Sequence, residues 1–291
     1  MNERLKTAKE IIITGGGPVG VETAGEIGEK LNGARSSLTA RKAKITLIAG
    51  GSRLVPALRQ SLGLKAENLL NRVGVEVIYN TKVTSVELGG ADNSTEKDFD
   101  TTDDNYGPTG GSTQAPGGIK TSRNQSSDKT IVTLDNGKTL TADVYIPAVG
   151  VTPNTSFVPS DWRDSNGYVK ANPTTLRVDV AGPRVYVVGD VGNYSRGGIL
   201  MLQSALPVVM TNIWNDLVHA NKEGGAKVGA KDRTFKDGTG ETHIVPIGKS
   251  AGVGAVYGWK LPGMMVKMIK GKDYWIGQKS KVVMGTQWSK P

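Results

Sequence analysis

Three glycines in one turn have the types and spacing to bind a phosphate group. They are Gly15, Gly17 and Gly20, in the stretch EIIITGGGPVGVE at residues 10–22. In the dinucleotide fingerprint the first glycine permits a tight turn, the second lets a pyrophosphate approach the backbone, and the third lets a helix pack on the strand. Residues 21–31 predict that helix, whose first amides and positive dipole end would face the pyrophosphate. The sequence therefore predicts a dinucleotide site made by Gly15, Gly16, Gly17, Pro18, Val19 and Gly20.

The end of the second expected strand bears on the choice between NAD and NADP. Residues 44–48 predict this strand, about 30 residues after the first, as a βαβ unit requires. An NAD-specific site usually carries an acidic residue near this point. This chain has AGGSR at residues 49–53 instead. Arg53 either meets the 2′-phosphate of NADP or is a solvated loop residue, so we expect NAD(P)H without a stated preference.

Composition excludes several kinds of site. The 291 residues include no cysteine, which excludes disulfides, cysteine–metal sites and a redox-active dithiol. Only two histidines occur, His219 and His243, far apart in the sequence, so we expect no metal site. No apolar run has the length of a transmembrane helix and no signal-peptide pattern is present. The expected location is the cytoplasm.

Positive charge is concentrated toward the C-terminus. Residues 222–291 hold thirteen Lys or Arg against five Asp or Glu, a net charge of +8 within a total of +9. Within them, residues 261–270 place Met264, Met265 and Met268 at helical spacings beside lysines. Such a segment is either a core helix with a solvated basic face or an interfacial helix on an anionic membrane, and both readings stay open. No nucleic-acid motif accompanies the charge, so no nucleic-acid partner is expected.

The spacing of apolar residues predicts the elements that hold these groups. Strands at 10–14, 44–48 and 75–79 alternate with helices at 21–31 and 57–73, which indicates an α/β fold with a Rossmann-type parallel sheet. Segments 82–88, 130–134 and 138–141 predict an appended antiparallel ribbon. Residues 89–129 contain almost no apolar side chain and are expected to be a disordered insertion.

The second half repeats the strand-and-glycine pattern. A strand at 142–150 ends in Gly150, and a second buried strand at 184–188 ends in Gly189-Asp190, where open α/β sheets bind ligands. Residues 199–217 predict a helix, and 243–288 a small α+β region.

These motifs together resemble the pyridine nucleotide–disulfide reductase superfamily, and within it the apoptosis-inducing-factor-like, ferroptosis-suppressor-type NAD(P)H:quinone reductases. The resemblance rests on GGGPVGVETAGEI at residues 15–27, AVGVTPN at 148–154, VVGDV at 187–191, GVGAVYG at 252–258 and residues 267–275. It covers nearly the whole chain outside residues 89–129. It implies that hydride passes from NAD(P)H to FAD and on to a quinone-like acceptor.

The resemblance also implies roles for individual residues. Glu22 would lie near the nicotinamide and Lys270 close to the flavin, and these two are the expected catalytic residues. Asp190 would bind the ribityl chain, and the amides opening the helix near Gln203 would face the isoalloxazine. Gly150 and Gly189 complete the expected cofactor-binding set. The implied domains are an NAD(P)-binding Rossmann-like domain at 1–147, a remnant of the FAD-binding domain at 148–225 and an α+β region at 226–291.

The sequence departs from the family pattern at its beginning. Family members start with a flavin-binding half that carries its own glycine fingerprint, and this sequence has one fingerprint. The expectation is therefore a truncated form in which FAD binding is weakened by the loss of several charge-assisted hydrogen bonds. The alternative is a repurposed non-redox protein that uses the vacated flavin pocket to bind, cyclise or isomerise a small hydrophobic molecule. A homodimer through the C-terminal region and a peripheral association with membranes are further expectations.

Overall fold

The computed structural model describes residues 3–89, 114–115, 119–124, 129–219, 231–237, 240–271, 277, 280 and 283–284. The chain forms two compact units, residues 1–150 with 241–291 and residues 151–240, and each is described by itself. The three functional regions expected from the sequence remain a prediction. None of the helices in the described part of the chain combines the length and the apolar character that crossing a bilayer requires.

A four-stranded parallel sheet forms the centre of the first unit. It contains β1 (Glu10–Thr14), β2 (Lys44–Ile48), β3 (Val75–Ile78) and β9 (Val144–Pro147) in the order β3-β2-β1-β9. Helix α2 (Pro18–Asn32) connects β1 to β2, and α3 (Gln60–Arg72) connects β2 to β3; a short helix, α1 (Glu3–Thr7), precedes β1. This arrangement confirms the α/β, Rossmann-type prediction, since parallel neighbours joined through helices define that fold.

Both faces of the parallel sheet are buried, as its continuous apolar runs require. Ile11 and Ile13 of β1 pack with α2 and α3 in one core cluster, and Ile12 packs in a second cluster on the opposite face. This alternation follows from the two-residue period of a strand.

A five-stranded sheet covers the second face. Its strands β4 (Val83–Gly89), β5 (Gln114–Ala115), β6 (Ile119–Asn124), β7 (Thr130–Leu134) and β8 (Thr139–Ala142) have the order β5-β6-β4-β7-β8. The pairs β4–β7 and β7–β8 are antiparallel, which confirms the predicted ribbon.

The expected disordered insertion at 89–129 is wrong where the structure describes it. Residues 90–113, 116–118 and 125–128 lie outside the described residues, but β5 and β6 are strands, and β6 pairs in parallel with β4. Ile119 supplies the physical reason, because this apolar side chain is 3% exposed and packs in the core between the two sheets. One buried side chain and the open edge of β4 are enough to order the strand.

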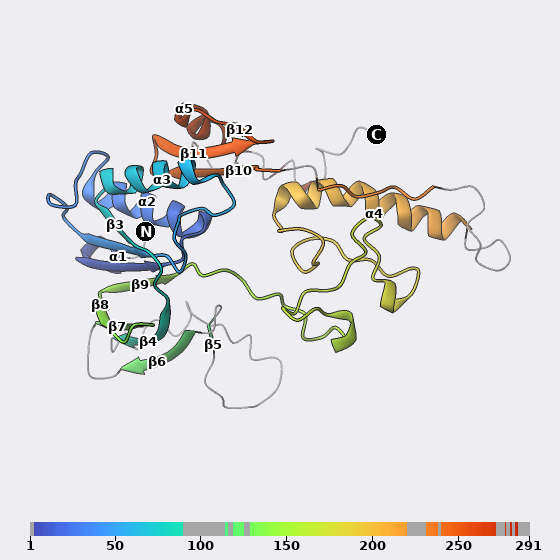
Figure 1. The fold of residues 1–291 in the computed structure, drawn as a ribbon, viewed down its shortest axis with the longest axis horizontal. Coiled ribbons are helices and arrows are strands. Elements are labelled where there is room, and N and C mark those ends of the chain that lie inside the picture. The colour runs from blue at the N-terminus through green and yellow to red at the C-terminus, as the bar shows by residue number, and fades with distance from the viewer. Residues whose placement is uncertain are drawn as a thin grey trace. The chain divides into compact units, whose positions relative to one another are not determined.

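The C-terminal segment returns to the first unit. Strands β10 (His243–Ile247), β11 (Ala251–Val256) and β12 (Trp259–Lys260) form an antiparallel sheet, followed by α5 (Gly263–Val266) and a π-helical turn, η4 (Lys267–Gly271). This sheet packs against α2 and α3, which therefore lie between it and the parallel sheet (Figure 1). Val245, Ile247, Val253 and Ala255 extend the core of the first unit into it.

The second unit is mostly irregular apart from one long helix. It contains the 3₁₀ turns η1 (Ser160–Trp162) and η2 (Asp179–Ala181) and the helix α4 (Ile199–His219). The predicted strand at 184–188 is wrong, since only an isolated bridge joins Tyr186 to Arg177. The carbonyl of Val185 accepts a hydrogen bond from the Val178 amide, and the Val187 amide donates to the carbonyl of Leu176. The segment therefore makes two backbone hydrogen bonds to residues 176–178 and belongs to none of the three sheets that the structure describes.

Candidate functional site: a glycine turn and a buried ion pair

The fingerprint turn is closed by backbone atoms that leave no room for side chains. The amide of Gly15 donates to the carbonyl of Ile48 at 2.8 Å, and Gly15 has φ of +124°. A β-carbon at Gly15 would lie 2.0 Å from the carbonyl oxygen of Ala148, and one at Gly20 would lie 1.9 Å from the carbonyl oxygen of Gly15. A side chain at either Gly15 or Gly20 would therefore disrupt the turn; at Gly15 this agrees with the tight-turn role, and at Gly20 the crowding comes from the turn as well as from the helix packing that the fingerprint assigns to this position.

Gly17 differs from both, because nothing lies within 4 Å of the place its β-carbon would occupy. It is the N-cap of α2, with φ −76° and ψ −179°, and no side chain caps the helix there. Pro18 occupies the first turn and Val19 is 65% exposed. The result is bare, accessible backbone at the start of a 15-residue helix, where the amides and the helix dipole favour an anion. A pyrophosphate fits this place by its chemistry.

Two other predicted residues border the same edge of the parallel sheet. Gly150, with φ +108°, follows β9, whose end is held to β1 by the Ala148 amide donating to Thr14 at 2.7 Å. Arg53 lies in the loop after β2, is exposed, and donates to the carbonyl of Pro56 at 2.7 Å. Because parallel strands end at one edge, these groups share the edge that carries the fingerprint.

Glu22 and Lys270 form an ion pair across 248 residues of sequence. The Lys270 Nζ lies 2.5 Å from Glu22 Oε1 and also donates to the carbonyl of Ile244 at 3.3 Å. The Lys270 side chain is 22% exposed and the Glu22 side chain 16%. Burial raises the pKa of Glu22, and the hydrogen bond and charge of Lys270 partly oppose that rise. The structure thus joins the two expected catalytic residues beside the helix that the fingerprint opens.

The remaining predicted residues lie in the second unit. Gly189 has φ +89°, and Asp190 accepts a hydrogen bond at Oδ1 from the amide of Gly198 at 2.7 Å, just before α4. Gln203 is exposed in the second turn of that helix. The structure therefore places Asp190 at the start of α4, with an exposed carboxylate that can accept from hydroxyl groups.

Two supporting groups were not identified from the sequence. The hydroxyl of Tyr194 accepts a hydrogen bond from the amide of Gly189 at 2.8 Å, which fixes the turn before Asp190. The Ile244 carbonyl helps to hold Lys270. No motif marks either contact, since one involves a generic tyrosine and the other a backbone atom.

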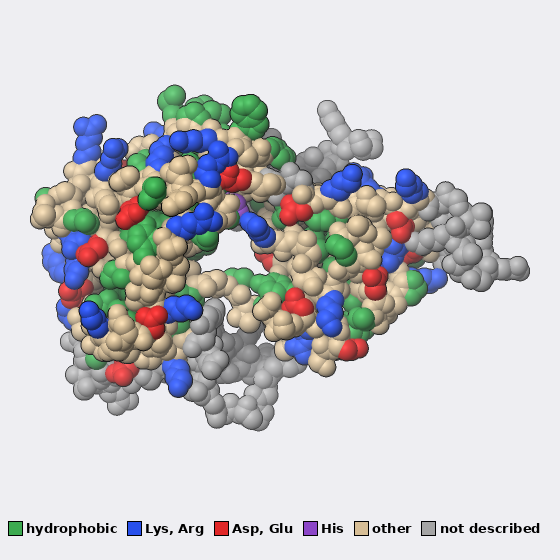
Figure 2. All heavy atoms as spheres, viewed as in Figure 1, with side chains coloured by type: hydrophobic (Ala, Val, Ile, Leu, Met, Phe, Trp, Pro, Cys, Tyr) green, Lys and Arg blue, Asp and Glu red, His purple; other side chains and the backbone are tan. Residues whose placement is uncertain are grey.

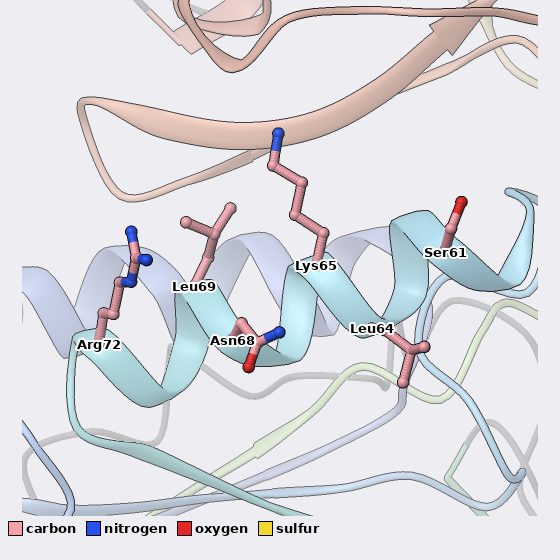
Figure 3. Close-up of a pocket in the computed structure, with 6 residues that line it drawn as sticks. All are labelled: Ser61, Leu64, Lys65, Asn68, Leu69 and Arg72. Carbon is pink, nitrogen blue, oxygen red and sulfur yellow. The ribbon is translucent and has the colours of Figure 1, made fainter.

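One hollow among the described residues of the first unit lies along α3, lined by none of the fingerprint residues. It has a volume of about 510 Å³ and is lined by Ser61, Leu64, Lys65, Asn68, Leu69 and Arg72. Figure 3 shows Lys65, Leu69 and Arg72 pointing toward the strands of the C-terminal sheet and Leu64 pointing away from them. None of these residues was predicted as part of a site.

Comparisons with known proteins show which families this chain resembles. Residues 2–105 match the family described as "Pyridine nucleotide-disulphide oxidoreductase". The chain is 41% identical over 290 residues to "Oxidoreductase phnG" of Penicillium herquei, a match that covers 98% of this chain and 62% of that protein. It is 23% identical over 283 residues to "Ferroptosis suppressor protein 1" of Taeniopygia guttata, covering 96% of this chain and 61% of that protein. With "Apoptosis-inducing factor homolog B" of Dictyostelium discoideum it shares 26% identity over 200 residues, covering 66% of this chain and 43% of that protein.

The chain spans 62% of the length of the Penicillium oxidoreductase and 61% of the ferroptosis suppressor protein. The matched family domain contains β1, α2, β2, α3 and β3, which carry the fingerprint and Glu22. Residues 2–105 therefore match the pyridine nucleotide-disulphide oxidoreductase family, and the chain is similar to an oxidoreductase, to a ferroptosis suppressor protein and to an apoptosis-inducing factor homolog.

Proposed function

We propose that this chain binds NAD(P)H at the fingerprint turn and serves a flavin-dependent NAD(P)H oxidoreductase of the apoptosis-inducing-factor-like type, with a quinone-like acceptor. The observation that carries the proposal is the bare backbone at Gly17, at the N-terminus of α2, between two glycines where a β-carbon would overlap a backbone carbonyl oxygen. The match of residues 2–105 to the pyridine nucleotide-disulphide oxidoreductase family and the similarity to oxidoreductases support it.

The residues present fit a nicotinamide dinucleotide. Gly17 leaves open the volume that a side chain would fill, and the first amides of α2 would donate to the pyrophosphate. Glu22 lies one helical turn further along α2. In this arrangement the turn holds and orients the nucleotide, and it supplies no proton or electron itself.

The residues of the second unit fit part of a flavin. Asp190 would accept from ribityl hydroxyls, and the amides that open α4 near Gln203 would face an electronegative ring edge. FAD, when bound, would supply the two-electron chemistry between NAD(P)H and the acceptor. The expectation that this chain is a truncated form of a longer protein stays a prediction.

The Glu22–Lys270 pair would hold a fixed positive charge near the reacting groups. The carboxylate of Glu22 and the carbonyl of Ile244 fix the Lys270 ammonium in place. A positioned cation stabilises negative charge that develops during hydride transfer, and its low-dielectric setting strengthens that effect. We assign Lys270 this electrostatic role and Glu22 the role of holding it.

Arg53 gives a test of cofactor preference. Its guanidinium is exposed in the loop after β2, where the ribose of a bound dinucleotide is held in this fold. If Arg53 meets a 2′-phosphate, Arg53→Ala raises KM for NADPH roughly tenfold, which corresponds to one charge-assisted hydrogen bond, and leaves KM for NADH unchanged. An unchanged KM for both nucleotides would show that Arg53 is a solvated loop residue.

The proposed function is tested by following NADH and NADPH oxidation at 340 nm by the purified chain, with and without added FAD and with short-chain quinones. The expected result is FAD-dependent oxidation that Lys270→Met slows and that Lys138→Met, at an exposed turn, leaves unchanged. No oxidation of either nucleotide under any of these conditions would contradict the proposal and favour the non-redox binding or cyclase alternative.

A further inference from the structure

The edge of the C-terminal sheet carries a group of apolar side chains that face solvent. Tyr257 is 69% exposed, Trp259 81%, Met264 72% and Met268 70%. Figure 2 shows hydrophobic side chains standing out from the outline over α5 and β12. We call these four residues the apolar tip. Exposed patches of this kind mark interaction sites in soluble domains.

The geometry of α5 and η4 explains why these side chains project. Val266 is fully buried against Gly252 and Gly254 of β11, and Lys270 turns inward to Glu22. Met264 and Met268 are four residues apart and therefore lie together on the other side of the turn. Tyr257 and Trp259 flank Gly258, whose carbonyl accepts a hydrogen bond from Arg59. Both halves of the tip are thus fixed from within the first unit.

The described segment that carries the tip has charged side chains of one sign. Residues 243–271 contain no Asp or Glu and four lysines. Two of these, Lys260 and Lys267, are exposed and adjoin the tip residues Trp259 and Met268 in the sequence. Lys65 of α3 adds a third cation there, since a β-carbon at Gly263 would lie 3.9 Å from its Nζ. The nearby Glu241 is already paired with Arg59. The complementary partner is therefore anionic.

We propose that the apolar tip and its lysines dock this protein on an anionic lipid bilayer. Protruding Met side chains leave water favourably on entering an apolar phase, and exposed Trp and Tyr side chains prefer the membrane–water interface. Lysines beside them attract anionic headgroups. An acidic protein surface would complement the charge of the lysines, but its charged groups would not bury the four exposed apolar side chains. The bilayer satisfies both features, and the proposal does not depend on the reductase assignment.

The test is co-sedimentation of the full-length chain with vesicles of phosphatidylcholine alone or with 30% phosphatidylserine, at low and high salt. We expect binding to the anionic vesicles that weakens with salt. Met264→Ser with Met268→Ser should lower the partition coefficient by at least about tenfold. Lys260→Glu with Lys267→Glu should lower it by at least about 25-fold, at roughly fivefold per cation.

Matched variants distinguish binding through the tip from nonspecific adsorption of the protein to vesicles. Met210→Ser, at a 67% exposed position of α4, and Lys42→Glu with Lys138→Glu, at exposed positions of the first unit, should bind like wild type. The tip residues are exposed, so circular dichroism should show unchanged folding. Absence of binding, equal binding to both vesicles, or equal losses in tip and control variants would each overturn the proposal.

Discussion

The three glycines of the fingerprint have different physical roles. At Gly15 and Gly20 a β-carbon would overlap a carbonyl oxygen, so these positions maintain the turn. At Gly17 a side chain would meet only solvent, so this position maintains access to the backbone. Substitutions within residues 15–20 can therefore separate the stability of the fold from the binding of a nucleotide.

The first prediction concerns that separation. Gly20→Ala should lower the free energy of unfolding by about 1–3 kcal/mol, because its β-carbon has no space beside the Gly15 carbonyl. Gly17→Asn should leave it unchanged or slightly raised, because asparagine is a good N-cap and φ of −76° suits any residue. Urea denaturation measures both. Equal losses would mean that Gly17 is also a packing residue.

A second prediction concerns the pKa of Glu22. Burial raises it and Lys270 opposes the rise, so Lys270→Met should raise the pKa further. The folded state then binds the Glu22 proton more tightly than the unfolded chain does, so the associated stability is present below pH 4.5 and lost as pH rises through the folded pKa. Carboxyl ¹³C NMR of Glu22 follows the titration. A pKa that falls or stays unchanged would mean that the ion pair is not formed.

At the scale of elements, apolar runs predicted the parallel sheet because its strands are buried on both faces. β1, β2 and β7 begin and end where their patterns predict. The pattern failed at 184–188, where Val187 is buried but pairs with one short segment and no sheet. It also failed at β6, where a single buried Ile119 orders a polar strand. Burial was predicted at 184–188 and was not predicted at Ile119, and the partner strand was predicted in neither case.

The second unit is held by a polar network that sequence patterns did not indicate. Arg177 pairs with Asp216 of α4 at 2.9 Å and with Asp232 at 2.6 Å, and its guanidinium lies over the ring of Tyr186, which donates to Asp216. Arg177 and Asp216 are 10% and 6% exposed. This network links Asp232 and the bridged residues Arg177 and Tyr186 to α4.

The third prediction follows from that network. Arg177→Met should lower the free energy of unfolding of the second unit by about 3–5 kcal/mol, because it removes the buried guanidinium that Asp216 and Asp232 share. Arg184→Met, at an exposed position of the same unit, is the matched control and should change little. Thermal unfolding of the two variants compares them. Similar melting temperatures would show that the network is dispensable.

At the scale of the whole molecule, the first unit is assembled from both ends of the chain. Residues 241–271 complete it by packing on α2 and α3, and they bring Lys270 to Glu22. Composition and periodicity placed Lys270 on a basic Met-rich segment, and only the family resemblance linked it to the site. A contact across 248 residues depends on the tertiary fold, which local patterns do not specify.

The most direct test of the account is titration of the full-length chain with NADPH and NADH, comparing Gly17→Asp with Gly17→Asn. Both side chains cap α2 equally well, so folding is preserved in each. The carboxylate would repel the pyrophosphate from the helix N-terminus. We predict that the wild-type chain binds nucleotide, that Gly17→Asn binds it more weakly, and that Gly17→Asp has an affinity lower by at least about 100-fold. Absence of binding by wild type, or wild-type affinity in Gly17→Asp, would contradict this prediction.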